Sequence, residues 1–154
     1  MISGYFASLI IIFSGIFVGL LMGYMAKEEL VPGRKYFEML QHMIFLAILA
    51  VFFLKNWSVV FVLLIALLVI VFSFSKEREA LYYLSLAPVL FFAWLYNGFA
   101  ILAPLAFLYG FPIGTIYLHE HIKDKPLKHI YGIIYRYYGF LLLGIMLGII
   151  GLVL

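Results

Sequence analysis

One short stretch of this sequence is rich in histidine and carboxylate side chains, which are residue types that can bind a metal ion or transfer protons. His119, Glu120 and His121 are consecutive, and Asp124 and His129 follow closely. A zinc site needs three or four ligands at about 2.0–2.2 Å, but side chains two residues apart on a helix point roughly 200° apart. The His-Glu-x-x-His pattern of helical metalloproteases is absent. The sequence therefore favours histidines satisfied by water, lipid phosphate or backbone, and it does not identify a cofactor.

Four polar residues at helical spacing form a second constellation. Arg34, Glu38 and His42 are four residues apart, so on a helix they share one face, with Gln41 beside them. The interpretation we favour is a salt bridge that anchors the start of a helix at the membrane edge, where unpaired charges are costly. The alternative is a site for a lipid headgroup, a proton or a small polar ligand, facing Arg136 and the last loop.

These two constellations and Arg136 supply every residue to which we assign a possible role in binding or catalysis. The ligand-binding hypothesis uses Arg34, Glu38, Gln41, His42, His119, His121 and Arg136. The weak candidates for a metal site are His119, His121 and His42. For acid–base catalysis the candidates are Glu38, His42 and Glu120, because a carboxylate or a histidine of suitable pKa can move protons.

The composition excludes a soluble globular protein. The chain has 154 residues, of which 68% are hydrophobic and 11% charged, and its mean hydropathy is +1.20, whereas soluble domains are about half apolar. It has no cysteine, which removes disulfides, thiolate metal sites and cysteine nucleophiles. Ten Lys and Arg residues divided among several loops are too few for a nucleic-acid surface. The sequence predicts an integral membrane protein whose first partner is the lipid bilayer.

The apolar segments between the charged clusters predict an all-α, polytopic bundle of six transmembrane helices in a single domain. We expect spans at residues 2–25, 36–54, 57–74, 81–96, 99–118 and 131–154. As one helix, residues 81–118 would measure roughly 57 Å at about 1.5 Å per residue, nearly twice the apolar thickness of a bilayer. Asn97-Gly98 is the natural turn within this stretch.

The distribution of cations supports six spans and predicts their orientation. With six spans, nine of the ten Lys and Arg residues fall on one side and only Lys55 on the other; a single span over residues 81–118 would split them evenly. Because Lys and Arg in short loops favour the cytoplasm, we expect both termini on the non-cytoplasmic side. Four cations near the last loop, Lys123, Lys125, Lys128 and Arg136, would also attract anionic lipid headgroups.

Glycine and proline residues predict where helices pack and bend. Gly15, Gly19 and Gly23 repeat every four residues, as do Gly144 and Gly148, so each set lies along one helix face and permits close approach of another backbone. We favour packing within the chain over a homo-oligomer or a partner membrane subunit. Prolines inside the predicted spans predict kinks at Pro88, Pro104 and Pro112. Because Gly110 and Gly114 flank the last of these, a broken helix is an alternative there.

Aromatic residues lie toward the ends of the predicted spans. Tyr131, Tyr135 and Tyr138 recur at helical spacing, and Tyr83 and Tyr109 also fall near predicted boundaries. Amphipathic rings prefer the headgroup level, so the pattern predicts an aromatic belt.

The function that this pattern favours is a small permease-like protein or an accessory membrane subunit. It would bind or pass a small solute or a lipid at the cytoplasmic side. A membrane enzyme acting on a lipid-linked substrate through a His/Glu site is the first alternative, and a structural subunit of a larger complex is the second. The predicted spans carry no ionisable residue near mid-membrane, which argues against ion-coupled transport.

Overall fold

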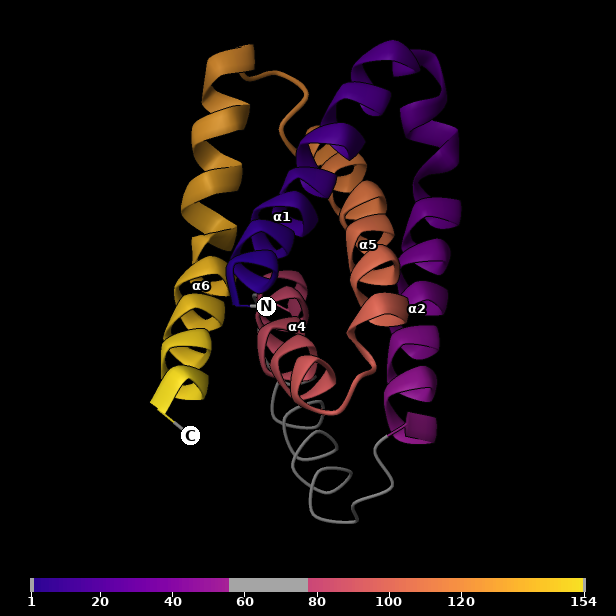
Figure 1. The fold of residues 1–154 in the computed structure, drawn as a ribbon. Helices are drawn as coiled ribbons and strands as arrows, with labels where there is room; N and C mark the ends of the chain where they lie inside the picture. Colours follow the sequence, from indigo (N-terminus) through magenta and orange to yellow (C-terminus); the bar gives the residue numbers. More distant parts are fainter. Residues whose placement is uncertain (1, 56–77, 154) are drawn as a thin grey trace.

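The computed structural model describes residues 2–55 and 78–153, and every regular element within these ranges is helical. The elements are α1 (Ile2–Met25), the 3-10 helix η1 (Lys27–Glu29), α2 (Leu30–Lys55), α4 (Arg78–Leu95), α5 (Phe99–Glu120) and α6 (Pro126–Val153). They form an elongated bundle (Figure 1). The all-α class is thus confirmed for the described part of the chain. The third predicted span, residues 57–74, lies outside the described residues.

Four segments are long and apolar enough to cross a membrane: Gly4–Met25, Lys27–Leu54, Phe99–Glu120 and Pro126–Leu152. The apolar part of α4, Glu79–Leu95, is shorter. Large apolar side chains remain exposed on the outside of the bundle, for example Ile10, Leu46 and Met146, as expected of a surface that faces lipid rather than water. These features identify a helical membrane protein, while the count of six spans and the orientation stay predictions.

The two chain ends lie toward the same end of the bundle (Figure 1). Tyr5, near the start of α1, packs its ring 5.3 Å from Trp94 and 5.7 Å from Phe99, which lie where α4 ends and α5 begins. The α1–α2 and α5–α6 connections lie at the opposite end. We call this the loop end and define it by η1 and residues 121–125.

Three described helices begin before their predicted spans: α4 begins at Arg78 rather than residue 81, and the difference is larger for α2 and α6. α2 starts at Leu30 rather than residue 36, and α6 starts at Pro126 rather than residue 131. Hydropathy locates only the apolar part of a helix, whereas the helical backbone continues into the polar boundary. Pro32 and Pro126 fit there because N–H groups in the first turn of a helix have no intrahelical acceptor.

The turn between α4 and α5 lies at Asn97-Gly98. Asn97 has a φ of 60°, the left-handed conformation that commonly ends a helix. The Gly98 N–H donates to the Ala93 carbonyl at 2.7 Å, which satisfies one of the carbonyls left free at the end of α4. This tight connection sets α4 antiparallel to α5.

α1 and α5 touch through their backbones. Gly15 and Gly19 on α1 meet Gly110 and Gly114 on α5. A Cβ added at Gly110 would lie 2.7 Å from the carbonyl carbon of Gly15, and one at Gly114 would lie 3.0 Å from the carbonyl carbon of Gly19 and overlap the Ile16 carbonyl oxygen. All four positions therefore have no room for a side chain, and packing within the chain accounts for this part of the glycine stripe.

The rest of the predicted glycine stripe also faces side chains of the same chain. A Cβ at Gly23 would lie 2.9 Å from Leu118 on α5. On α6, a Cβ at Gly144 would lie 2.8 Å from Leu9, and one at Gly148 would lie 2.8 Å from Phe6. α1 therefore packs against α5 on one side and α6 on another.

The prolines do not interrupt their helices. Pro104 and Pro112 lie inside the continuous helix α5, and Pro88 lies inside α4. The broken-helix alternative for α5 is therefore wrong, because Gly110 and Gly114 serve the contact with α1 and the backbone stays helical around them. Whether each proline bends its helix stays a prediction.

Several tyrosines that the sequence assigned to an aromatic belt lie in the core instead. Tyr83 is 0% exposed and Tyr109 is 1% exposed. The Tyr83 hydroxyl donates to the Ile12 carbonyl at 3.2 Å, and Tyr5 donates to the Gly144 carbonyl at 3.2 Å. A tyrosine can be buried in this way because its hydroxyl reaches a backbone acceptor on a neighbouring helix. By contrast, Tyr135 is exposed, as a belt residue would be.

We predict that Gly114→Ala destabilises the bundle by about 1–3 kcal/mol, because the added methyl group would force two backbones apart. Gly4→Ala is the matched control, since a Cβ at Gly4 meets nothing within 4 Å. Both variants should be purified in the same detergent and their unfolding followed by circular dichroism. Equal stability of the two variants would contradict the backbone contact.

Candidate functional site

A cavity of about 500 Å³ opens between α2, α4, α5 and α6. We call it the four-helix cavity. Its polar lining residues are Glu38, Gln41, His42, Glu79, Glu120 and Arg136, and its apolar and aromatic lining residues are Phe45, Leu46, Leu49, Tyr82 and Tyr109. The structure thus brings five polar residues singled out in the sequence, Glu38, Gln41, His42, Glu120 and Arg136, to one place.

One face of α2 supplies the wall of the cavity. Its lining positions, from Glu38 through Gln41 and Phe45 to Leu49, follow the three- and four-residue spacing of a helix face. The polar positions come first along α2 and the apolar ones follow, because the helix passes from the loop end into the bundle. The cavity is therefore polar toward the loop end and apolar deeper in.

Arg34 and Glu38 form the ion pair expected of the helix start. Arg34 Nε donates to Glu38 Oε1 at 2.7 Å, with 45% and 42% of the two side chains exposed. An exposed pair at this spacing stabilises a helix by only about 0.3–0.5 kcal/mol. Arg34 does not line the cavity. His42 Nδ1 lies 2.6 Å from the Glu38 carbonyl oxygen one turn earlier on α2.

Glu120 and Arg136 join α5 to α6 at the edge of the cavity. Arg136 Nη1 lies 3.5 Å from Glu120 Oε2, and the Arg136 guanidinium lies 5.9 Å from the centre of the Tyr137 ring. Arg136 also lines a second hollow, of about 530 Å³, between α4, α5 and α6. The arginine therefore separates the two spaces.

Glu79 is a cavity residue that the sequence analysis missed. It lies in the first turn of α4, and no described residue donates a hydrogen bond to its buried Oε2 atom. The Tyr137 hydroxyl is nearby but likewise makes no hydrogen bond of acceptable geometry within the described ranges. The sequence places Glu79 at the end of a charged cluster. In the structure Tyr82, three residues further along α4, lines the same cavity.

Gln41 and Tyr109 form the buried polar contact of the cavity. Gln41 is 5% exposed, and its Nε2 donates to the Tyr109 hydroxyl at 3.4 Å. Among the described residues, the hydrogen bond of the Gln41 side chain is the one that its Nε2 donates to Tyr109. A buried amide of this kind is expected to have partners at both ends.

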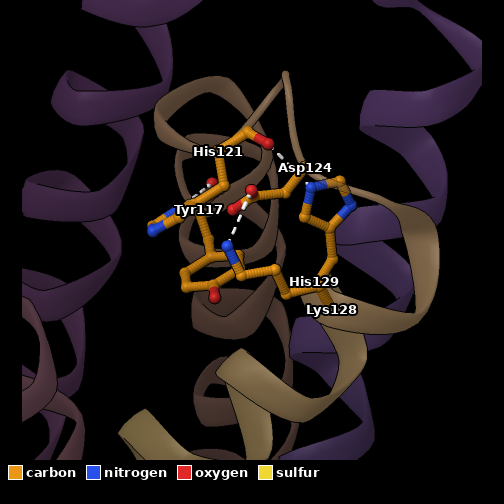
Figure 2. Close-up of polar contacts among 5 residues, drawn as sticks. All are labelled: Tyr117, His121, Asp124, Lys128 and His129. Atoms are coloured by element: carbon orange, nitrogen blue, oxygen red, sulfur yellow. Dashed lines mark hydrogen bonds and ion pairs between the residues drawn. The ribbon is translucent and has the colours of Figure 1, made fainter.

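The histidines of the last loop hold the end of α5 (Figure 2). His121 Nδ1 lies 3.0 Å from the Tyr117 carbonyl oxygen. His129, which is 2% exposed, donates from Nε2 to the His121 carbonyl at 2.8 Å. Its Nδ1 accepts from the Tyr24 hydroxyl of α1 when the ring is neutral. The Tyr117 and His121 carbonyls also accept backbone N–H groups, from His121 and Asp124. The rings therefore add hydrogen bonds at the end of α5, and His129 links α6 to α1.

Asp124 and Lys128 complete this loop through an ion pair of 2.8 Å (Figure 2). The hydrogen bond from Lys128 lowers the pKa of Asp124 below its usual value. Asp124 is therefore a carboxylate at neutral pH.

The three metal candidates do not come together. His42 lines the four-helix cavity and His121 lines the second hollow, while His119 Nδ1 is buried and lacks a hydrogen-bond partner in the described part of the chain. No group of three or more His, Asp or Glu side chains among residues 2–55 and 78–153 is arranged to hold a metal ion. The spacing of His119 and His121, which sends them to different sides of α5, is the physical reason.

No protein-family model, curated protein or solved structure matches this chain. The function must therefore be argued from the site itself. A cavity with carboxylates, an arginine and an amide at one end and apolar side chains at the other can hold a molecule with a polar head and an apolar tail.

We predict that His129→Ala lowers the free energy of unfolding by about 1–3 kcal/mol, because it leaves the Tyr24 hydroxyl without its partner and removes one of the two hydrogen bonds to the His121 carbonyl. His42→Ala should change it by less than about 0.5 kcal/mol, since the exposed His42 ring contacts only its own helix backbone. Unfolding in detergent measures both. A loss of stability that is larger for His42→Ala would contradict a structural role for His129.

Proposed function

We propose that this chain is a small membrane protein, permease-like or an accessory subunit, that binds a small amphiphilic solute or a lipid in the four-helix cavity. The observation that carries the proposal is the gradient of the lining along α2, from Glu38 and Gln41 to Phe45 and Leu49. A ligand with one polar end would place that end near the membrane boundary and its apolar part inside the bundle. The cost of desolvating the polar group is then limited.

The loop end would face the cytoplasm. Cations of both described connections gather there, namely Lys27, Arg34 and Lys35 on one and Lys123, Lys125 and Lys128 on the other. The positive-inside tendency supports this orientation. The cavity would then open near the inner leaflet, and both termini would lie outside.

Because the chain has no native cysteine, single cysteines can test the orientation directly. Tyr96→Cys lies in the turn at the end where the termini lie, and Lys125→Cys lies at the loop end. We expect a membrane-impermeant maleimide to label Tyr96→Cys on intact cells and Lys125→Cys only after permeabilisation, a difference of about tenfold or more for sites fully protected by the bilayer. The reverse pattern would overturn the orientation, and labelling of both on intact cells would contradict a bilayer between them.

Ligand-dependent stability tests the binding function. A ligand at about one hundred times its Kd should raise the free energy of unfolding by about 2.7 kcal/mol. We expect at least one amphiphile in a panel with neutral, anionic and cationic head groups to raise the free energy of unfolding in this way. Leu49→Trp should abolish this stabilisation, because the larger side chain fills the cavity. Leu142→Trp is the control, because Leu142 is exposed on α6 and does not line the cavity. No stabilisation by any head class, or equal effects in both variants, would overturn the proposal.

A second function is favoured by one observation. Glu38, His42 and Glu120, the candidates for acid–base catalysis, all line the same cavity. A membrane enzyme that cleaves a lipid-linked substrate there would lose activity on His42→Ala while still binding its substrate. Binding without turnover of lipid-linked substrates in the wild-type chain would favour the first function.

A further inference from the structure

Carboxylates supply hydrogen-bond acceptors to the four-helix cavity. They are Glu38, Glu79 and Glu120. Arg34 is engaged by Glu38, and Arg136 lies near Glu120. The Glu79 Oε2 atom receives no hydrogen bond from any described residue. A ligand that brings a donor would satisfy this buried acceptor.

Gln41 gives an independent indication of the same kind. Its side chain is almost entirely buried and lines the cavity. The amide donates to Tyr109, but its oxygen has no donor within the described residues. An acceptor held in a buried position by a contact on its other side is a ready partner for an N–H group.

The charge balance points to a cation. Three carboxylates line the cavity. Glu38 and Glu120 each have an arginine within ion-pair distance, whereas Glu79 forms no ion pair with a described residue, although the charge of Arg136 also acts on it. At the membrane edge, where the dielectric is lower than in water, an uncompensated charge is expensive unless a partner arrives.

Aromatic rings form the wall next to this charge. The Phe45 ring centre lies 5.1 Å from that of Tyr82 and 5.7 Å from that of Tyr109. A cluster of aromatic side chains of this kind attracts ammonium groups, because the face of each ring carries partial negative charge. Leu49, one turn further along α2, continues the wall as an apolar surface.

We propose that the ligand of the four-helix cavity is an amphiphile with a protonated primary amine. Its N–H groups would donate to Glu79 and to the Gln41 oxygen, and its alkyl chain would lie along Phe45 and Leu49. This inference rests on the proposed binding function and adds the chemical class of the ligand. A quaternary ammonium has the charge but no N–H donor, and a carboxylate or phosphate head would meet like charge.

Four probes with the same chain length separate these features: octylammonium, octyltrimethylammonium, octanol and octanoate. Their binding to the full chain in phosphatidylcholine nanodiscs would be measured by calorimetry, with empty nanodiscs subtracted. We expect octylammonium to bind about tenfold or more tightly than the other three, because charge-assisted hydrogen bonds are made by it alone. Glu79→Gln should remove most of this preference.

Two further variants keep the result interpretable. Glu28→Gln removes a carboxylate from the exposed helix η1 at the loop end, outside the cavity, and should leave the preference unchanged. Gln41→Leu removes the neutral acceptor and should weaken octylammonium several-fold, which tests the site even where Glu79→Gln fails to fold.

The outcomes distinguish this inference from the function on which it rests. Equal binding of octanol and octylammonium, tighter binding of octyltrimethylammonium, or an unchanged preference in both Glu79→Gln and Gln41→Leu would overturn the amine assignment and leave the binding function standing. If none of the four probes binds and no other amphiphile stabilises the chain, both are wrong.

Discussion

The contact between the backbones of α1 and α5 determines where every other described helix can lie. In a bilayer, lipid tails are as apolar as the helix surfaces, so close van der Waals packing and interhelical hydrogen bonds must hold the helices together. Gly19 and Gly114 allow this approach, and the Thr115 hydroxyl lies 3.0 Å from the Gly19 carbonyl oxygen across the contact. With α5 held against α1, the rest of the α5 surface is available for α2, and Tyr109 and Glu120 reach the cavity from it.

α1 also positions α4 and α6, through tyrosines rather than glycines alone. The Tyr83 hydroxyl of α4 donates to an α1 carbonyl, and the Tyr5 hydroxyl of α1 donates to an α6 carbonyl. At the loop end, His129 ties α6 to α1 and to the end of α5. α2 contacts α4 through the rings of Phe45 and Tyr82, and the four-helix cavity lies among α2, α4, α5 and α6.

The sequence was sufficient to predict the class of protein and some local features, namely a turn and the faces of close helix packing. Hydropathy identifies the apolar helices, Asn97-Gly98 lies in the turn between α4 and α5, and glycines every four residues mark a face for close packing. It could not show that Gly15 and Gly19 meet Gly110 and Gly114, because pairing between helices depends on their relative positions. For the same reason Tyr83 and Tyr109 resembled belt residues until their hydrogen-bond partners on other helices were visible.

The polar site likewise could be predicted from the sequence only where its residues lie on the same helix. The stripe from Glu38 to His42 follows from helical spacing, and its meeting with Glu120 and Arg136 requires the fold. Glu79 was missed because a charge at the edge of an apolar segment has the same sequence signature whether it faces water or a cavity. The last-loop histidines, conversely, resembled ligands by residue type, but His121 and His129 are engaged by backbone carbonyls.

The depth of the charged groups bears on which kind of membrane function the cavity can serve. Glu79 and Glu120 lie at the ends of α4 and α5, and Glu38 lies about two turns inside α2. Headgroups and water limit the cost of ionisation for charged groups near a membrane boundary. Deeper in the described helices the cavity walls are rings and aliphatic side chains. A charged head held at the loop end would find no counter-charge further along these helices, so crossing the bundle would cost much more than binding at its edge. This asymmetry supports capture of an amphiphile at one face of the membrane over ion-coupled translocation through the described helices.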